Sequence, residues 1–301
     1  MVTKLKGHFT LPAHSIDTAQ IENIKKLPFL EDGDPPQTHM KLWGNTKLGL
    51  SCYYAPFEYV NLEAKLILVG ITPGGTQMNR ALNAMRSALS TGTPIADAMR
   101  QAKRAGSFSG DMRLNIVKTL DQLGYQHKLG IESTSELWGD AYNHLVHFCS
   151  LLKFPVFLNG KNYNKIPKAH KEDEDLKQML YEHFVKDMET LPHNAMLVPL
   201  GDTVIEVVKS IREQGFIPQE IMKFEGRFVA PPHPSPENKE SINLLIEPVY
   251  PTEEAYTERM YRKYLARLKK DEKPQNEHTY KKARATRWKS MLFVRRAYGL
   301  Q

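Results

Sequence analysis

The chain has 301 residues, of which 41% are hydrophobic and 25% charged, a balance typical of a folded globular protein rather than a disordered one. Its two cysteines, Cys52 and Cys149, exclude a disulfide framework and a four-cysteine zinc or iron–sulfur site. No apolar run approaches the roughly 20 residues of a membrane span, and the N-terminus lacks a signal-peptide core. We therefore expect a cytoplasmic protein without membrane contact.

The net charge of +7 is concentrated near the C-terminus. Residues 259–301 hold 14 lysines and arginines against three acids, so this segment carries +11 and the rest of the chain −4. Such an asymmetry is typical of a segment that binds a polyanion, and a solvated basic helix is the alternative. Aromatic residues interleave with the arginines, which suits phosphate contact with base stacking. We expect DNA as the partner, contacted by Lys281, Arg284 and Arg287.

Apolar residues recur at helical spacing along most of the chain. The expected helices lie at 15–27, 81–89, 93–106, 111–123, 142–152, 173–191, 203–214, 252–270 and 280–297. Short apolar runs bounded by turn residues predict strands buried on both faces, as in a parallel sheet. These runs are Leu66–Val69, Pro155–Leu158, Ala195–Leu200 and Arg227–Ala230.

Strands that alternate with helices predict an α/β fold, a three-layer α/β/α sandwich around a mostly parallel four-stranded sheet. We expect this domain to occupy residues 1–250, with its core at 50–240. Residues 251–301 would form a basic helical extension. We expect a monomer without cofactor.

Unusual residues follow three of the predicted strands. Gly70–Gln77 follows the first strand, Asn159-Gly160 the second, and His233-Pro234-Ser235-Pro236 the fourth. The carboxyl ends of parallel strands meet at one edge of the sheet, where ligands bind, so we expect these segments to converge on one pocket. The glycines allow backbone N–H groups to approach a ligand closely, although an ordinary strand-to-helix turn is the alternative reading of the first segment.

This ordered set resembles the uracil-DNA glycosylase superfamily over roughly residues 50–240. That superfamily has a first motif G-x-[DNA]-P-[YG], a middle strand that ends in a base-reading Asn, and a late HPSP motif. They are matched here by Gly70-Ile71-Thr72-Pro73-Gly74, by Phe157-Leu158-Asn159 and by His233–Pro236. The continuation PSPEN looks most like the single-strand-selective monofunctional branch. The resemblance implies a DNA glycosylase that hydrolyses the N-glycosidic bond of a flipped-out base and leaves an abasic site.

The resemblance also assigns roles to residues. Asn159 would read the Watson–Crick edge of the base, because an amide offers both an acceptor and donors; an Asn in a left-handed turn is the alternative. His233 would donate to a base oxygen as the bond breaks. Ser235 and Pro236 would contact phosphates. The base pocket would be formed by Gly70, Ile71, Pro73, Gly74 and Gln77.

Three departures from the superfamily pattern matter. Thr72 stands where many relatives place a catalytic Asp or Asn, so we expect weak activity or a substitute group. Asn79 and Asp111 are the two candidate substitutes, and a helix N-cap is the alternative role for Asp111. Glu237 replaces the Leu or Arg that relatives insert into the DNA stack, which leaves Asn238 as a candidate wedge.

Gly74 replaces the Tyr that excludes 5-substituted pyrimidines in strict uracil enzymes. We therefore expect a pocket that accepts 5-modified pyrimidines or uracil, in DNA repair or in defence against phages with modified DNA. The alternative function is a catalytically weak or inactive DNA-binding or sensing protein on the same scaffold. A general nucleotide-binding enzyme is disfavoured, because the glycine turn lacks both the GK[ST] ending and the GxGxxG spacing.

Overall fold

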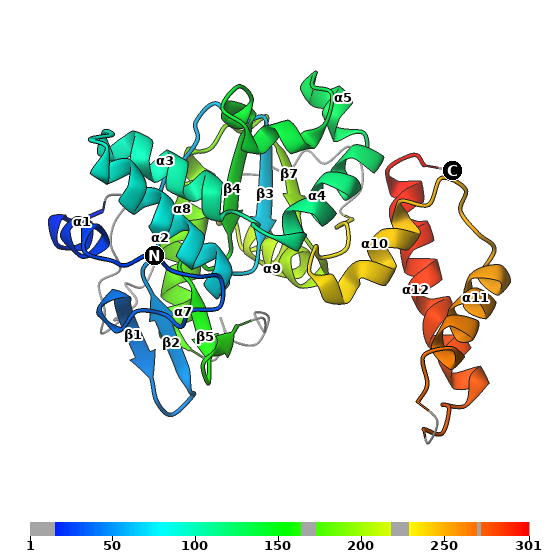
Figure 1. Ribbon diagram of the computed structural model, residues 1–301. Helices are drawn as coiled ribbons and strands as arrows, with labels where there is room; N and C mark the ends of the chain where they lie inside the picture. Colours follow the sequence, from blue (N-terminus) through cyan, green and yellow to red (C-terminus); the bar gives the residue numbers. More distant parts are fainter. Residues whose placement is uncertain (1–15, 164–172, 218–228, 270–271, 301) are drawn as a thin grey trace.

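The computed structural model describes residues 16–163, 173–217, 229–269 and 272–300. The apolar run predicted as the first strand forms β3 (Leu66–Gly70), in which every residue is buried. β3 is the middle strand of a three-stranded parallel sheet of order β4-β3-β7, between β4 (Val146–Ser150) and β7 (Met196–Pro199) (Figure 1).

Helices cover both faces of this sheet (Figure 1). Alternate residues of a strand point to opposite faces, and β3 accordingly contributes to two separate hydrophobic cores. Ile67 and Val69 pack in one core, with α2 (Gly75–Ser90), α3 (Ile95–Gly106) and α9 (Asp202–Glu213). Leu66 and Leu68 pack in the other core, with α4 (Asp111–Gln122), α10 (Lys239–Leu245) and α12 (Glu277–Ala297). The protein is therefore an α/β protein with helical layers on both sides of the parallel strands.

The helices agree largely with the sequence-based prediction. They are α1 (Thr18–Lys25), α2 (Gly75–Ser90), α3 (Ile95–Gly106), α4 (Asp111–Gln122), α5 (Tyr125–Leu129), α7 (Glu174–Met179), α8 (Lys186–Thr190), α9 (Asp202–Glu213), α10 (Lys239–Leu245), α11 (Glu253–Leu265) and α12 (Glu277–Ala297). The predicted helix 173–191 is divided into α7, a π-helical turn at Leu180–Val185, and α8. Thr252 caps α11 by accepting a hydrogen bond from the Ala255 N–H, as its sequence position indicates.

A second, antiparallel sheet was not predicted. It has the order β1-β2-β5-β6 and consists of β1 (Lys41–Asn45), β2 (Leu50–Tyr53), β5 (Val156–Leu158) and β6 (Lys161–Asn162). The predicted strand Pro155–Leu158 does form, as β5, but it pairs antiparallel with β2 rather than joining the parallel sheet. The expectation of a single four-stranded, mostly parallel sheet therefore differs from the arrangement of the described residues.

One of the two strands beside β3 is β4, which lies in a segment predicted as helix 142–152. Its residues Val146 and Phe148 are buried, and so are the flanking residues Leu145, Leu151 and Leu152. A strand that is apolar on both faces lacks the two-residue alternation, and its periodicity does not distinguish it from a buried helix. That ambiguity explains the wrong helix assignment.

The fourth predicted strand, Arg227–Ala230, falls partly outside the described residues. Its last two residues, Val229 and Ala230, do not lie in a strand. The next residue, Pro231, accepts a hydrogen bond of 3.0 Å from the Gly201 N–H just beyond β7. The segment that leads to His233 thus runs beside the end of β7 without forming a regular strand.

The basic C-terminal helix is part of the fold. Met291 and Val294 of α12 are buried in the core that contains Leu66 and Leu68, and the Tyr298 hydroxyl donates to the Val229 carbonyl.

In the described residues, no helix combines the length and the apolar character that a membrane crossing requires.

We predict that Arg295 anchors α12. Its guanidinium is 2% exposed and donates to the carbonyls of Leu245 and Glu247, both at 2.8 Å. Arg295→Met removes the donor of the buried Leu245 carbonyl and of the partly buried Glu247 carbonyl, and lowers the free energy of unfolding by about 2–3 kcal/mol. The control is the exposed neighbour, Arg296→Met, which changes it by less than about 0.5 kcal/mol. Urea unfolding measures both values, and equal effects would contradict the anchoring role.

Candidate functional site

Four residues lie near one another at the carboxyl ends of the parallel strands: Gly70, Ser150, Gly201 and His233. Gly70, the last residue of β3, pairs with Ser150, the last residue of β4. Gly201 follows β7 on the other side of β3, and a Cβ added to Gly201 would lie 2.8 Å from the Cβ of His233. The glycine turn after β3 and the HPSP segment therefore share one edge of the sheet, as the sequence predicts.

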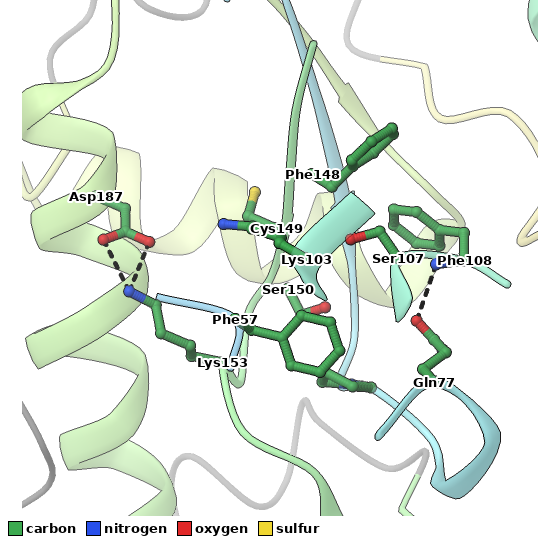
Figure 2. A pocket seen from close by; sticks show the side chains of 11 residues that line it. Phe57, Gln77, Lys103, Ser107, Phe108, Phe148, Cys149, Ser150, Lys153 and Asp187 are labelled. Carbon is green, nitrogen blue, oxygen red and sulfur yellow. Dashed lines mark hydrogen bonds and ion pairs between the residues drawn. The ribbon is translucent and has the colours of Figure 1, made fainter. Parts of the chain in front are cut away.

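A pocket lies at the ends of β3 and β4 (Figure 2). Its lining includes aromatic rings from Phe57, Phe108 and Phe148 and polar groups from Gln77, Lys103 and Ser150. Its cavity of about 20 Å³ has room for a water molecule rather than for a nucleobase. Any larger ligand therefore needs a lining side chain to move.

Phe108 and Gly70 depend on each other. Phe108 is a non-glycine residue with a positive φ of 49°, a backbone conformation that costs on the order of 1–3 kcal/mol. Its ring occupies the space beside Gly70, where a Cβ would lie 2.9 Å from the Phe108 Cε1 atom. Its N–H donates to Gln77 Oε1 at 3.0 Å, so the Gln77 amide keeps its N–H donors for the pocket (Figure 2).

Two of the candidate catalytic residues make structural hydrogen bonds. The Thr72 hydroxyl donates to the Phe154 carbonyl at 3.1 Å. Asn79 is fully buried, and its amide donates to the carbonyls of Glu31 and Asp34. Both side chains hold loops in place, and neither lines the pocket.

Asp111, the third candidate for the role of catalytic carboxylate or amide, has a side chain that makes no structural contact of this kind in the described part of the chain. It is exposed, it is the first residue of α4, and within the described residues its side chain has no hydrogen bond or ion pair. Gly110, with a φ of 76°, occupies the N-cap position, so Asp111 does not have the alternative N-cap role.

Asn159 lies outside the pocket. It forms the turn between β5 and β6 together with Gly160, and both residues have positive φ, 49° and 74°. This Asn-Gly pair is the two-residue turn that favours a β-hairpin, which was the alternative reading of the motif. The residue at the end of the strand beside β3 is Ser150. The base-reading role predicted for Asn159 has no support in this position.

The rest of the glycine turn is split between pocket and core. Pro73 and Gln77 line the pocket, whereas Ile71 packs against the hydrophobic core. The space beside Gly74 is bordered by Asn162, whose Nδ2 would lie 3.0 Å from a Gly74 Cβ and whose Oδ1 accepts from the Gly75 N–H. The Asn162 amide on β6 thus borders the space that the absence of a side chain at Gly74 is expected to leave open.

The HPSP segment fixes the tautomer of its histidine. His233 Nδ1 accepts a hydrogen bond of 3.2 Å from the Ser235 N–H, so the neutral ring carries its proton on Nε2. Burial lowers the pKa of His233, and nearby Glu237 only partly opposes this shift. Asn115 of α4 holds the segment by donating to the Pro234 carbonyl at 2.8 Å. His233 is therefore a neutral Nε2–H donor.

The phosphate-contact candidates divide into two groups. Ser235 Oγ accepts from Asn238 Nδ2 at 3.1 Å and keeps its own proton for a ligand, and Pro236 is exposed. On α12, Lys281 pairs with Glu258 and Glu277, while Arg284 and Arg287 both pair with Glu240. These three cations hold helices together. Lys282 and Arg296 are exposed and have no ion pair within the described part of the chain.

Sequence reasoning missed Phe57, Lys103, Phe108 and Ser150. A signal exists for Lys103, because it shares one face of α3 with Met99, Ala102 and Gly106, all of them buried. The sequence contains no comparable signal for Ser150, because its strand is predicted as a helix.

Among the described residues, no cluster of three or more His, Cys, Asp or Glu side chains is arranged to hold a metal ion.

We predict that Gly70→Ala destabilises the protein through the Phe108 ring. Overpacking of this kind lowers the free energy of unfolding by about 1–3 kcal/mol. The double variant Gly70→Ala/Phe108→Leu recovers part of the loss, because the clashing ring atoms are gone. Gly33→Ala is the control, since no atom lies within 4 Å of its added Cβ. Full stability of Gly70→Ala would contradict this packing.

We predict that His233 stays neutral at pH 6.5. Burial lowers its pKa, so protonation occurs only at lower pH. The chemical shift of its Cε1 proton, assigned by comparison with His233→Gln, reports the midpoint in an NMR titration. A midpoint at or above 6.5 would contradict the lowered pKa.

Comparison with known proteins gives one relevant similarity. The chain is 32% identical over 206 residues to the uncharacterized protein YoxB of Bacillus subtilis (strain 168), and the match covers 68% of this chain and 76% of YoxB. No family model matches the chain, and no solved structure matches it. The chain belongs to the same family as YoxB.

Proposed function

We propose that the protein is a monofunctional DNA glycosylase that hydrolyses the N-glycosidic bond of a flipped-out pyrimidine, uracil or a 5-modified base, and leaves an abasic site. The observation that carries this proposal is the position of His233, a neutral Nε2–H donor, at the same sheet edge as the aromatic pocket. The motif resemblance to the uracil-DNA glycosylase superfamily supports it independently.

The pocket chemistry suits a pyrimidine. Aromatic rings from Phe57, Phe108 and Phe148 offer apolar faces to a flat base, and the Gln77 amide and the Ser150 hydroxyl offer hydrogen bonds to its edge. The small cavity fits a site that opens only when a nucleotide has left the stack, an event that costs a few kcal/mol. In this proposal Gln77 and Ser150 replace Asn159 as readers of the base.

The bond-breaking step needs negative charge to be stabilised on the departing base and positive charge on the sugar. His233 Nε2–H donates to the base oxygen that becomes negative. Asp111 is the carboxylate that orients the attacking water or stabilises the sugar cation, because Thr72 and Asn79 are held by backbone carbonyls. In the proposed complex the Ser235 hydroxyl donates to a phosphate beside the flipped nucleotide.

The biological setting that fits is repair of cytoplasmic DNA or defence against phages with modified bases. Gly74 has no side chain to exclude a 5-substituent, and the Asn162 amide lies beside it, just outside the lining of the small pocket. In this proposal a hydrogen-bonding 5-substituent reaches this polar border when the pocket opens. In this proposal the protein acts on DNA as a monomer, without a cofactor.

One observation favours a second candidate, a DNA-sensing protein that binds without cutting. Neither Thr72 nor Asn79 is available to activate water, so the catalytic function depends on Asp111 alone. If Asp111 lies too far from the sugar, the scaffold binds a flipped base but does not release it.

Incubation with oligonucleotides that contain uracil, 5-hydroxymethyluracil, 5-hydroxymethylcytosine or its glucosylated form tests the proposal. Both single-stranded and duplex forms are needed, and alkaline cleavage reveals abasic sites. We expect strand cleavage at one or more of these bases after alkali, and none with His233→Ala. Retained binding with no abasic site on any substrate would favour the sensing function and contradict the glycosylase.

We predict that Asp111→Asn lowers the excision rate by about 10²-fold or more, the range typical of positioned acid–base groups. Asp97→Asn is the matched control, because Asp97 is also an acid in the first turn of a helix, α3, and does not line the pocket. A single-turnover assay separates chemistry from product release. An unchanged rate for Asp111→Asn would remove Asp111 from the mechanism.

A further inference from the structure

Two lysines are buried at the inner end of the pocket. Lys103 of α3 and Lys153, which follows β4, are each 4% exposed, and both line the cavity (Figure 2). Removing an ammonium from water costs several kcal/mol unless partners compensate for it. Each buried charge therefore needs a structural or functional reason.

Lys153 has a structural reason. Its Nζ lies 2.8 Å from Asp187 Oδ2, and Asp187 is only 1% exposed. The two charges compensate each other, and the pair joins the segment after β4 to α8. A ligand that formed an ion pair or hydrogen bond with Lys153 in place of Asp187 would leave the buried Asp187 carboxylate without this lysine.

Lys103 has no such partner. Its Nζ donates to the Tyr59 carbonyl at 2.5 Å, and no carboxylate lies within ion-pair distance of it in the described part of the chain. An ammonium has three N–H donors, so two remain beyond the bond to Tyr59. Lys103 lines this cavity and also a second, smaller one that Tyr59 and His147 border, so a ligand in the first cavity is one group that these donors can reach.

The surroundings keep this lysine close to its protonation midpoint. The pKa of Lys103 is lowered to about 8, chiefly by burial; Lys153 adds to this shift, whereas Asp187, Cys149 and Glu58 oppose it. Buried His147 also faces the cluster, and its own pKa is lowered by burial. The ammonium is thus charged at neutral pH and loses its proton as the pH rises through about 8.

We propose that Lys103 is a specificity-determining residue of the pocket, whose ammonium donates to an oxygen atom carried by the bound pyrimidine. This inference rests on the proposed glycosylase function and names the substrate feature that the site selects. The oxygen belongs either to a ring carbonyl or to an oxygen-bearing 5-substituent, and both are acceptors of the same kind.

The arrangement of the pocket gives the reason. In Figure 2, Gln77 and Phe108 lie on one side and the Lys153–Asp187 pair on the other, with Lys103 beside Cys149 between them. A base between these walls presents one edge to Gln77 and another to Lys103. A buried cation also stabilises negative charge that develops on the departing base, because the low dielectric strengthens the attraction.

The test compares Lys103→Met with Arg100→Met. Methionine keeps a long aliphatic side chain but removes the ammonium, and Arg100 is an exposed residue one turn earlier on α3. We expect Lys103→Met to lower kcat/KM by about 10²-fold or more at a temperature where the variant remains folded, as its melting curve shows, and Arg100→Met to leave kcat/KM unchanged. Equal kcat/KM for Lys103→Met and wild type would overturn the proposal.

Substrates and pH distinguish the source of the oxygen and the role of the charge. If the 5-substituent supplies the oxygen, the Lys103→Met variant excises 5-hydroxymethyluracil more slowly than wild type but excises uracil at the wild-type rate. If a ring carbonyl supplies the oxygen, the variant excises both bases more slowly. The wild-type rate falls as pH rises through about 8, and this fall is absent in Lys103→Met. Persistence of the fall in the variant, or borohydride trapping of a covalent Lys103–DNA complex, would overturn the proposal.

A binding measurement separates this inference from the proposed function. Isothermal titration with the free bases uracil and 5-hydroxymethyluracil requires no catalysis. A tenfold or greater loss of affinity in Lys103→Met supports the inference even if no DNA is cut, in which case only the glycosylase function fails. Equal affinities, or no binding of either base to the wild type, would overturn the role of Lys103.

Discussion

The structure depends on a single strand that is buried on both faces and ends in a glycine. β3 supplies side chains to both hydrophobic cores, so its position is determined by the helices on either side of the sheet. At its end, Gly70 leaves the space that the Phe108 ring fills. Because that ring also lines the pocket, the geometry of the site follows from the packing of the core.

The edge of the sheet then combines two kinds of chemistry. On the β4 side, aromatic rings, an amide and buried lysines surround a small cavity. On the β7 side, the HPSP segment holds a neutral histidine, and Asn115 ties that segment to α4. Asp111 begins the same helix one turn before Asn115, so α4 connects the segment that carries His233 to the carboxylate proposed to act on water or the sugar.

The sequence predicts the helices and the central strand well because their signals are local. The cap at Thr252 and the apolar spacing of α4 need no knowledge of the rest of the chain. The location of the glycine turn and the HPSP segment at one edge also follows from the α/β pattern. By contrast, the pairing partners of a strand depend on distant residues, so β5 was placed in the wrong sheet and β4 was taken for a helix.

The site residues show the same division. Gln77 and Pro73 lie in the pocket, as their motif indicates. Asn159 does not, because an Asn-Gly pair is equally a hairpin turn and only the register of β5 decides between the two roles. Thr72 and Asn79 make hydrogen bonds to carbonyls in distant segments, which no local pattern reveals. The ion pairs of Lys281 and Arg284 are of the same kind, because their partners Glu258 and Glu240 lie on other helices.

The central claim is that this sheet edge hydrolyses an N-glycosidic bond. The most direct measurement is mass spectrometry of the products formed from uracil-containing or 5-modified DNA. We expect release of the intact free base together with an equal amount of DNA that carries an abasic site, with both products lost in His233→Ala. Absence of a free base, or release of a whole nucleotide, would contradict it.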